Sequence, residues 1–499
     1  MTPARRKVVM IVDNSVDGDS RVQKVARSAA AGGWDVVLVG RSRSGQVETY
    51  ELGEAQVRRV PVAMTLLGHR LRAPRRRWRW PLAYPHRDEA AYRARRLDAL
   101  KLRVNERRAA QKLRGASLPQ RVLSKLLVLR IRAGVLLHKV RNDQFRRASD
   151  SHREPDGRIA QLRARLVTAL RPRSAWRRLD PLLEDYPLVY EPLLHELRPD
   201  LVHAHDFRMV GIAARVAEQR RSKGHRCAAV YDAHEFLPGV RYRSKGWHLG
   251  NEAHEATYAP RCDAVVTVSP RLAQMLQARH GLAELPTVVL NAPALRPGGE
   301  APDGGVRAVC GLADDVPLLV YAGSPSPQRG LATVVHGLTL MPDAHAAMLL
   351  PPGKHADDLA KLAAELGVGE RLHVLPYVEQ DLVVPFLRSA DVGLVPIHHH
   401  VNHEIALITK YFDYSLAGLP IVTSDVETMG GVTRELGNGE VFVAEDVEDL
   451  VRAVRAVLAS PQRYRAAYTP EVLDGWTWQA QEKVLLELYD RLVPEGDAA

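Results

Sequence analysis

The chain has 499 residues, of which 46% are hydrophobic. This length is too great for one compact core, and this composition excludes a disordered protein. The net charge of +12 is unevenly placed, because residues 71–180 contain 31 Lys and Arg against 9 Asp and Glu, a net charge of +22, which leaves about −10 (12 − 22) for the rest. We therefore expect two or three domains and one strongly basic segment.

The cysteines Cys227, Cys262 and Cys310 are far apart and lack the spacing of zinc ligands, which favours a reducing compartment. The apolar run near the N-terminus ends at Asp13, too early for a signal peptide. No segment reaches the roughly 18 apolar residues of a membrane span. The expected location is the cytoplasm, with peripheral attachment to the inner face of the plasma membrane as an open alternative.

The chain opens as a βαβ unit. Val8–Val12 is a β-branched apolar run typical of a parallel strand covered on both faces. A loop containing Gly18 follows, then a helix that runs to Ala31 and a strand at Val36–Val39. The loop lacks the G-x-G-x-x-G dinucleotide fingerprint, so we interpret it as a strand-end loop that faces a cleft.

Between about residues 66 and 180 a basic helical insertion interrupts the α/β alternation. It contains the run Arg75–Trp80, which combines arginines with tryptophans, and helical patterns at Ala90–Leu113 and Arg121–Val140. The last pattern keeps its apolar and basic side chains apart, as in a helix that lies on an anionic membrane. The apolar residues are Val122, Leu126, Leu129, Ala133, Leu136 and Leu137, and the basic ones are Lys125, Arg132 and Lys139.

Two interpretations of the insertion remain open. In one, the helices form a hairpin whose apolar face packs on its own domain while the arginines are solvated. In the other, residues 71–147 contact an anionic membrane surface or a lipid-linked substrate. Nucleic acid is not an expected partner, because no RNA- or DNA-binding motif is present.

After Asp180 the α/β alternation resumes in two successive units. In the first unit, strands are expected at Leu201–His205, Ala228–Asp232, Ala264–Ser269 and Val288–Leu290. In the second, they are expected at Leu318–Ala322, Ala347–Leu350, His373–Leu375, Val392–Val395, Ile421–Thr423 and Val441–Val443. Each unit reads as a doubly wound parallel sheet, so ligands are expected at the carboxyl ends of the strands.

The domain boundaries follow from this alternation. Residues 1–295 form the first domain, the proline- and glycine-rich residues 296–306 form a linker, and residues 307–475 form the second domain. The amphipathic segment 476–499 is expected to cross back over the junction as a helix and tail. The predicted architecture is therefore α/β, with two Rossmann-like domains that face a central cleft.

Histidines follow two strands of the first domain. His234 comes directly after the strand Ala228–Asp232, where its side chain projects into the cleft or serves as a structural histidine. The segment His203–Asp206 offers two histidines and an aspartate, with His203 and His205 on one face of the strand. We find no third metal ligand at a suitable spacing, so no metal is expected.

Two turns of the second domain suit a phosphate. Tyr321–Gly330 follows a strand and opens a helix, so its glycines permit close backbone approach while Arg329 supplies a permanent cation. An ordinary turn with an exposed arginine is the alternative. Thr428–Gly431 is expected to form a second turn, with free N–H groups, before a helix at Val432–Leu436.

The segment His403–Asp425 combines a polar loop, a helix that begins near Ile408, a Gly-Leu-Pro stop and a buried strand. Lys410 and Asp413 are three residues apart and share one face of this helix near its N-terminus, which suits a nucleotide diphosphate. An ordinary surface ion pair is the alternative. The consecutive histidines at 398–400 cannot all face one metal ion from a regular element, so they are interpreted as loop residues.

These motifs together resemble the GT-B-fold glycosyltransferases of family 4, which are retaining and use nucleotide-sugar donors. The resemblance rests on DGDSRVQKVARSAAAGGWDV, PDLVHAHD, VVYDAHEF, CDAVVTVSPRLAQML, VVLNAP, the YAG…RG turn and KYFDYSLAGLPIVTSD. It covers nearly the whole chain except the basic insertion. It implies that the first domain binds the acceptor and the second domain binds the nucleotide sugar.

The resemblance also implies roles for single residues. His234 matches the histidine that contacts the donor sugar, Arg329 and Lys410 match basic residues near the pyrophosphate, and Asp413 matches the glutamate that binds the ribose. The sequence departs from the family where Ile405 holds the position of a first glutamate, with Glu404 one residue out of register, and where Ser324 replaces a common arginine. The predicted donor site comprises Gly323, Ser324, Arg329, Tyr377, Glu404, Lys410, Asp413, Gly430 and Gly431, and the predicted acceptor-side cleft comprises Gly18, Arg21, His205 and Glu235.

The function implied is transfer of a sugar, with retention and without a metal or other cofactor, to a cell-envelope glycan or lipid-linked acceptor. His234, Arg329 and Lys410 are the expected catalytic residues. A sugar-nucleotide epimerase of the same fold and a non-catalytic, membrane-associated scaffold are the alternatives.

Overall fold

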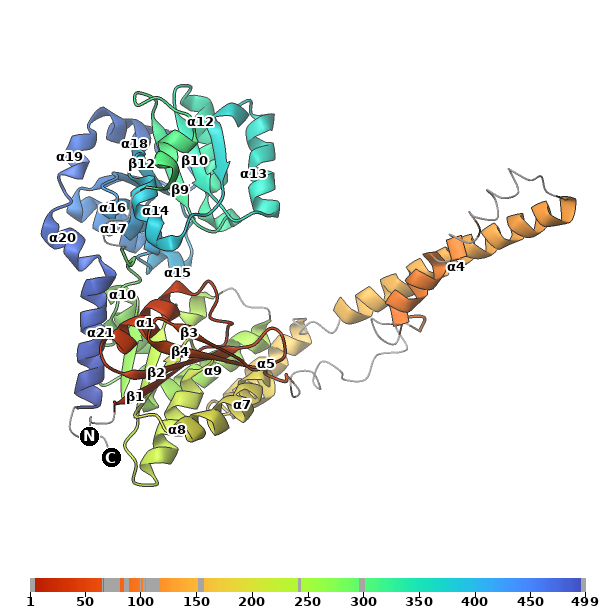
Figure 1. Cartoon of the computed structure of the whole chain (residues 1–499), viewed down its shortest axis with the longest axis horizontal. Helices are drawn as coiled ribbons and strands as arrows, with labels where there is room; N and C mark the ends of the chain where they lie inside the picture. The colour runs from red at the N-terminus through yellow and green to blue at the C-terminus, as the bar shows by residue number, and fades with distance from the viewer. Residues whose placement is uncertain are drawn as a thin grey trace.

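The protein forms two lobes, one above the other in Figure 1, and its last long helix runs along the side of the lower lobe. The structure, a computed structural model, describes residues 5–64, 66, 81–84, 89–98, 100–101, 104, 117–150, 157–240, 244–295 and 301–494. The arginine- and tryptophan-rich run Arg75–Trp80 and residues 296–300 of the linker predicted at 296–306 lie outside these residues.

The N-terminal lobe is built on an eight-stranded sheet with the order β3-β4-β2-β1-β5-β6-β7-β8. All neighbouring pairs are parallel except β3 and β4, which form an antiparallel hairpin. The strands are β1 (Lys7–Ile11), β2 (Asp35–Arg41), β3 (Glu48–Leu52), β4 (Ala55–Val60), β5 (Leu201–His205), β6 (Ala228–Ala233), β7 (Ala264–Thr267) and β8 (Thr287–Val288). The strand order reverses between β1 and β5, which places a ligand crevice at their carboxyl ends.

The C-terminal lobe is built on a six-stranded parallel sheet with the order β11-β10-β9-β12-β13-β14. Its strands are β9 (Leu318–Ala322), β10 (His345–Leu349), β11 (Leu372–Leu375), β12 (Val392–Val395), β13 (Ile421–Ser424) and β14 (Gly439–Phe442). The order reverses between β9 and β12, so the second crevice lies where these two strands end. Both doubly wound sheets were predicted, whereas the hairpin of β3 and β4 was not.

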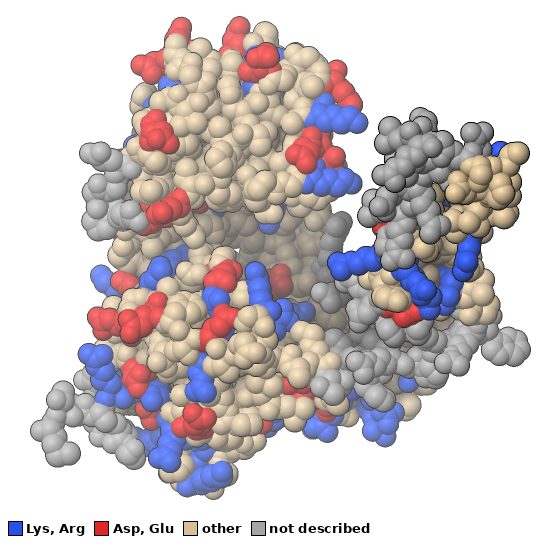
Figure 2. Space-filling model, turned by 45° about the vertical axis from the view of Figure 1, so that its right-hand side comes forward, with Lys and Arg blue, Asp and Glu red and all other residues tan. Residues whose placement is uncertain are grey.

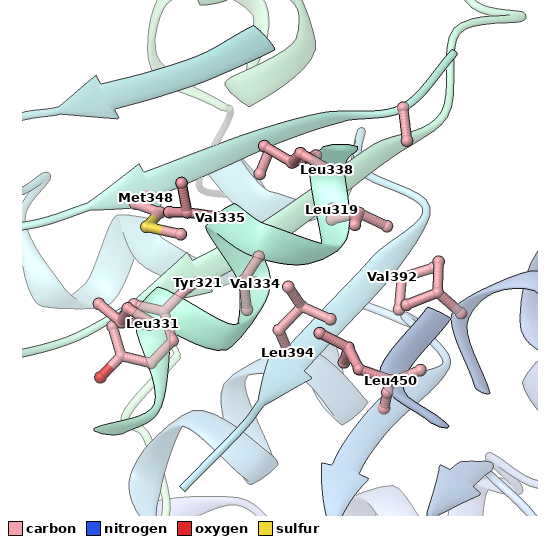
Figure 3. Close-up of a cluster of buried hydrophobic side chains, with 14 of the residues drawn as sticks. Leu319, Tyr321, Leu331, Val334, Val335, Leu338, Met348, Val392, Leu394 and Leu450 are labelled. Atoms are coloured by element: carbon pink, nitrogen blue, oxygen red, sulfur yellow. The ribbon is translucent and has the colours of Figure 1, made fainter. Parts of the chain in front are cut away.

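Helices cover both sheets because their apolar faces close the core. In Figure 3, the helix α12 (Leu331–Leu340) lays Leu331, Val334 and Leu338 against side chains from the strands below it. The other helices of the C-terminal lobe are α11 (Val306–Val309), α13 (Lys354–Glu365), α14 (Val383–Leu387), α15 (Val401–Glu404), α16 (Thr409–Leu416), α17 (Glu427–Leu436), α18 (Val447–Ala459), α19 (Pro461–Arg465) and α20 (Pro470–Gly475).

One helix of the N-terminal lobe borders the crevice of that lobe directly. The helix α1 (Ser20–Ala31) begins where the Asp19 carboxylate accepts a hydrogen bond from the Val22 N–H, and this cap sets the start of the helix beside the crevice. The lobe also contains α6 (Trp176–Leu179), α7 (Leu182–Leu197), α8 (Val210–Arg221), α9 (Lys245–Tyr258) and α10 (Pro270–His280).

The last helix, α21 (Trp478–Leu492), follows the C-terminal lobe in sequence but packs against the N-terminal lobe (Figure 1). The Trp478 N–H donates to the Pro293 carbonyl at 3.0 Å, and its indole donates to Ser28 Oγ at 2.8 Å. The Tyr489 hydroxyl reaches His203 Nδ1 at 2.5 Å, beneath the crevice. The helix is therefore held on the N-terminal lobe, although it follows the C-terminal lobe in sequence.

A long helical arm leaves the N-terminal lobe and extends well beyond it (Figure 1). It is formed by α4 (Leu118–Asp150), and α5 (Arg158–Leu170) lies at its base. The described part of the preceding segment runs beside α4, since Leu82 N–H donates to Gln144 Oε1 at 2.9 Å. No helix in the described ranges is both long enough and apolar enough to cross a membrane.

Candidate functional site

Asp232 is the centre of the N-terminal half of the candidate site. It lies near the end of β6 and is fully buried, and Arg21 of α1 donates to both of its carboxylate oxygens at 2.8 Å. Burial works against ionisation, but the charges of Arg21 and His234 hold the pKa of Asp232 well below its usual value. The aspartate is therefore a permanent anion inside the lobe.

Three histidines surround this carboxylate. The rings of His203 and His205 stack with centroids 4.3 Å apart, and His205 Nδ1 lies 3.2 Å from Asp232 Oδ2. Burial lowers the pKa of His205 to about 3, so this ring is neutral. His234 Nε2 lies 3.3 Å from Asp232 Oδ2, and its pKa is raised because the charge and hydrogen bond of Asp232 overcome the opposing effect of burial. The ring of His234 is thus held at the mouth of the cluster, with its side chain 23% exposed.

A third side chain that could bind a metal lies beside His203 and His205, contrary to the expectation from the sequence. His203, His205 and Asp232 offer three ligand atoms within 4.8 Å of one another, although the sequence showed no third ligand at a suitable spacing. Asp232 joins the histidines because β6 pairs with β5 in a register that places it opposite His205. The Arg21 guanidinium already pairs with both oxygens of Asp232, so a divalent ion would lie beside a second positive charge. The donor set therefore suits a guanidinium better than a metal.

Acidic side chains follow the two strands where the sheet order reverses. Asp13 follows β1 and pairs with Arg208, and Asp206 follows β5 with a left-handed φ of 74°. Burial, together with the charge of Asp13, raises the pKa of Asp206 to about 6. Burial, together with the charge of Asp206, raises the pKa of Glu235 to about 7. Sequence reasoning selected Glu235 but did not assign a role to Asp206, although its place directly after a strand was visible in HAHD.

The C-terminal half of the site is built around Lys410, in the first turn of α16. Its ammonium lies 3.5 Å from the centroid of the Tyr321 ring, at the end of β9. Gly323 permits this approach, because a Cβ atom there would lie 2.8 Å from Lys410 Nζ. Burial, with a further contribution from the Arg329 charge, holds the pKa of Lys410 well below its usual value. Within the described residues neither Lys410 nor Arg329 forms an ion pair, so both cations are available to an anion.

Asp413 lies one turn after Lys410 on the same face of α16, as predicted. It is 8% exposed, and burial raises its pKa to about 7 against the opposing charges of Lys24 and Lys410. Lys24 comes from α1 of the other lobe, donates to Asn291 Oδ1 at 3.0 Å, and was missed by sequence reasoning. Tyr377 is half-exposed. Burial and the charge of Asp413 raise the pKa of its hydroxyl, while the charge of Arg329 opposes them. These side chains form one electrostatic cluster at the junction of the lobes.

The second glycine turn predicted for phosphate binding is wrong. The helix α17 begins at Glu427, so Gly430 and Gly431 lie inside it rather than before it. The Gly430 N–H donates to the Val426 carbonyl at 2.9 Å and is not free. The Glu427 N–H donates to Glu404 Oε2 at 2.8 Å, so Glu404 caps this helix.

The remaining predicted residues occupy the strand-end loops. Ser324 is exposed, and its carbonyl accepts a hydrogen bond from the Tyr321 hydroxyl at 3.0 Å. Gly18 has a left-handed φ of 74° in the exposed loop before α1. The histidines at 398–400 lie outside regular structure, as predicted, and His399 pairs with Glu404 at 2.7 Å and Asp425 at 3.0 Å.

The two halves meet through the segment before α16. Ser269 Oγ donates to the Ile405 carbonyl at 2.7 Å, and the Phe236 N–H donates to Asn402 Oδ1 at 2.9 Å. Ile405, at the position of the family's first glutamate, is buried in a cluster of the N-terminal lobe. Figure 2 shows a hollow between the two lobes. One lobe thus contributes a buried anion and a histidine, and the other contributes two cations without an ion pair among the described residues; such cations suit a ligand with a diphosphate group.

Two family models match the chain, one for each lobe. Residues 145–292 match "Glycosyltransferase Family 4", and residues 306–470 match "Glycosyl transferases group 1". The chain is 25% identical over 308 residues to a glycogen synthase of Mycobacterium tuberculosis, covering 58% of this chain and 69% of that protein. It is 26% identical over 333 residues to a GDP-mannose-dependent alpha-(1-6)-phosphatidylinositol monomannoside mannosyltransferase of Mycolicibacterium smegmatis, covering 60% of this chain and 80% of that protein.

The fold also matches solved structures. A sucrose-phosphate synthase from Thermosynechococcus elongatus superposes with a TM-score of 0.59 and 14% sequence identity, covering 98% of this chain and 99% of that chain. This likeness concerns the arrangement of the two lobes alone. Because a glycosyltransferase model matches each lobe and the lobes have this arrangement, the chain belongs to the GT-B-fold glycosyltransferases of family 4.

Proposed function

We propose that this enzyme transfers a sugar from a nucleotide-sugar donor with retention of configuration and without a metal ion. The observation that carries the proposal is that Lys410 and Arg329 form no ion pair among the described residues, so two cations of the C-terminal lobe are available to an anion. A diphosphate leaving group gains negative charge as the sugar departs, and fixed cations stabilise that charge. The Arg21 guanidinium already donates to both carboxylate oxygens of Asp232, which supports the proposal that no metal takes part.

The donor is held, in this proposal, by α16 and the turn after β9. Lys410 and Arg329 bind the diphosphate, and Asp413 accepts hydrogen bonds from the ribose hydroxyls. His234 orients the sugar, since its ring projects from the rigid cluster around Asp232. In this proposal, the acceptor attacks the donor from the face that the diphosphate leaves, and the phosphate assists its deprotonation.

The acceptor proposed is a cell-envelope glycan or a lipid-linked molecule. The mannosyltransferase relative has a phosphatidylinositol monomannoside in its name, which supports a lipid-linked acceptor. The described part of the basic insertion supports contact between residues 71–147 and an anionic membrane, because Leu126, Leu129 and Leu136 are 57–65% exposed on α4. Figure 2 shows lysines and arginines on the described part of the arm.

Turnover of two variants tests the chemistry. A thermal-shift screen of nucleotide sugars first identifies the donor, and Arg329→Ala and Lys410→Ala are then expected to abolish transfer while the unfolding temperature stays close to wild type. Near-normal turnover in both variants would contradict the assignment of Arg329 and Lys410 to the donor diphosphate. Incubation with donor alone separates a transferase from an epimerase, because only an epimerase converts the donor without an acceptor. Donor binding without turnover on any acceptor would instead favour a scaffold.

A further inference from the structure

The helix α5 presents its large apolar side chains to the outside of the molecule. Ile159 is 85% exposed, Leu162 68%, Leu166 57% and Leu170 72%. Their spacing of three, four and four residues places them along one face of the helix, and we call these four residues the apolar stripe. Monomeric proteins rarely expose so many large aliphatic side chains together, which marks the stripe as a docking surface.

The inward face of α5 is the less apolar one. It packs against α9 through Ala164, which is 3% exposed, and through the half-buried Ala160, Val167 and Thr168. A surface helix usually turns its larger aliphatic residues toward the core and its small or polar ones outward. Because α5 does the reverse, packing within the lobe does not account for the apolar stripe.

Arginines border the apolar stripe on both sides. On a helical projection, Arg163 lies beyond one edge of the stripe, and Arg158 and Arg165 lie beyond the other. All three are exposed, and no acidic residue occurs in α5. This is the layout of a helix that inserts its apolar face between lipids while its guanidiniums contact anionic headgroups.

The same charges disfavour a second copy of the chain as the occupant. A symmetric contact between two copies of the stripe would bring the bordering arginines of one copy toward those of the other, without a carboxylate from either α5. We propose that the apolar stripe of α5 is a membrane-contact surface that inserts into an anionic bilayer. In Figure 1 α5 lies where the arm leaves the lobe, so the stripe would anchor the folded lobe as well as the arm.

This inference rests on the part of the proposed function that places the enzyme at a membrane, but not on its chemistry. It concerns residues outside 71–147, so the arm and the apolar stripe are tested separately. The test is sedimentation of the full chain with vesicles of phosphatidylcholine alone or with phosphatidylserine. The variants are Leu162→Gln/Leu166→Gln and the deletion of residues 71–147. Leu285→Gln is the matched control, because Leu285 is a 53% exposed leucine elsewhere on the same lobe.

We expect salt-sensitive binding to the anionic vesicles, reduced by at least about tenfold in Leu162→Gln/Leu166→Gln and unchanged in Leu285→Gln. Arg163→Gln/Arg165→Gln should weaken binding to anionic vesicles, whereas Lys361→Gln, on the C-terminal lobe, should not. Wild-type binding by the double leucine variant would overturn the inference, even if deletion of 71–147 abolished binding. A lipid-independent dimer that the leucine substitutions dissociate would also overturn it, in favour of a second copy.

Discussion

The Lys410 ammonium lies 3.5 Å from the centroid of the Tyr321 ring, and no described carboxylate forms an ion pair with it. The aromatic face provides some stabilisation, but burial and the nearby Arg329 still hold the pKa of this lysine well below its usual value. The protein therefore maintains a poorly compensated cation at the carboxyl edge of the sheet. An anionic ligand is the partner that this position lacks.

Replacing Lys410 should separate binding from folding. Lys410→Met keeps the length of the side chain and removes a buried charge, so the unfolding temperature should stay the same or rise. Donor affinity should fall by about 10- to 150-fold, because a hydrogen bond to a charged group is worth about 1.5–3 kcal/mol. Isothermal titration with the donor and thermal unfolding measure the two effects. Lys361→Met, at a 76% exposed lysine, serves as the control and should change neither.

The depressed pKa of Lys410 predicts how donor binding varies with pH. Binding requires the protonated lysine, so its contribution to affinity should be lost as the pH rises through the pKa of the free enzyme. That loss should begin well below the ordinary lysine value of about 10.4. Lys410→Arg should remove it, because the guanidinium stays charged up to about pH 12. A pH-independent affinity in the wild type up to about pH 10 would contradict the assignment of Lys410 to the donor diphosphate.

The ion pair of Arg21 and Asp232 should matter more for stability than an exposed pair. Arg21→Met leaves the fully buried Asp232 without its bidentate partner, which should cost about 3–5 kcal/mol of unfolding free energy. Arg261→Met breaks a pair whose side chains are 38% and 41% exposed, and it should cost no more than about 1 kcal/mol. Denaturant unfolding compares the two variants.

The same substitution has a second readout at the site. The Arg21 charge lowers the pKa of His234, while Asp232 raises it. Removing Arg21 should therefore raise the pKa of His234 further, provided that Asp232 stays ionised, and an NMR titration of the histidine ring would follow it. Equal stability of Arg21→Met and Arg261→Met, with an unmoved His234 titration, would show that Arg21 does not set the charge of this cluster.

Much of the fold was predictable because buried parallel strands have a strong local signal. The bounds of β5 and β9 agree with the ranges expected from apolar runs alone. The hairpin of β3 and β4 was missed because Glu48–Leu52 alternates polar and apolar residues with little apolar content, and its pairing with β4 is a tertiary contact.

Sequence spacing predicted where candidate side chains lie along the elements, but not which contacts they make. Lys410 and Asp413 share a helix face by sequence spacing, whereas the role of Glu404 depends on a capping contact with Glu427 that no local pattern encodes. In the same way, Asp232 is joined to His205 by strand register, and Lys24 reaches the donor side from the other lobe. Local patterns identify which residues end the strands, but packing decides which of them meet.

Asp413 predicts a measurable conflict between stability and donor binding. Its pKa is about 7 in the folded protein against an ordinary value of 3.8, so between these values the folded state binds more protons than the unfolded state. Wild-type stability from this group must then fall as the pH rises from about 4 to 7. Asp413→Asn lacks the titration, so it should gain stability relative to wild type over that interval while it binds the donor more weakly.

Lys24→Met tests whether a neighbouring positive charge contributes to the pKa of Asp413. Its charge lowers the pKa of Asp413, so its removal should raise that pKa further and extend the pH interval over which stability declines. Unfolding in denaturant at a series of pH values measures both variants against wild type. If wild type and Asp413→Asn kept a constant difference in unfolding free energy across the interval, Asp413 would have an ordinary pKa, which would contradict the strained charge cluster of Lys24, Lys410 and Asp413 on which the proposed donor site rests.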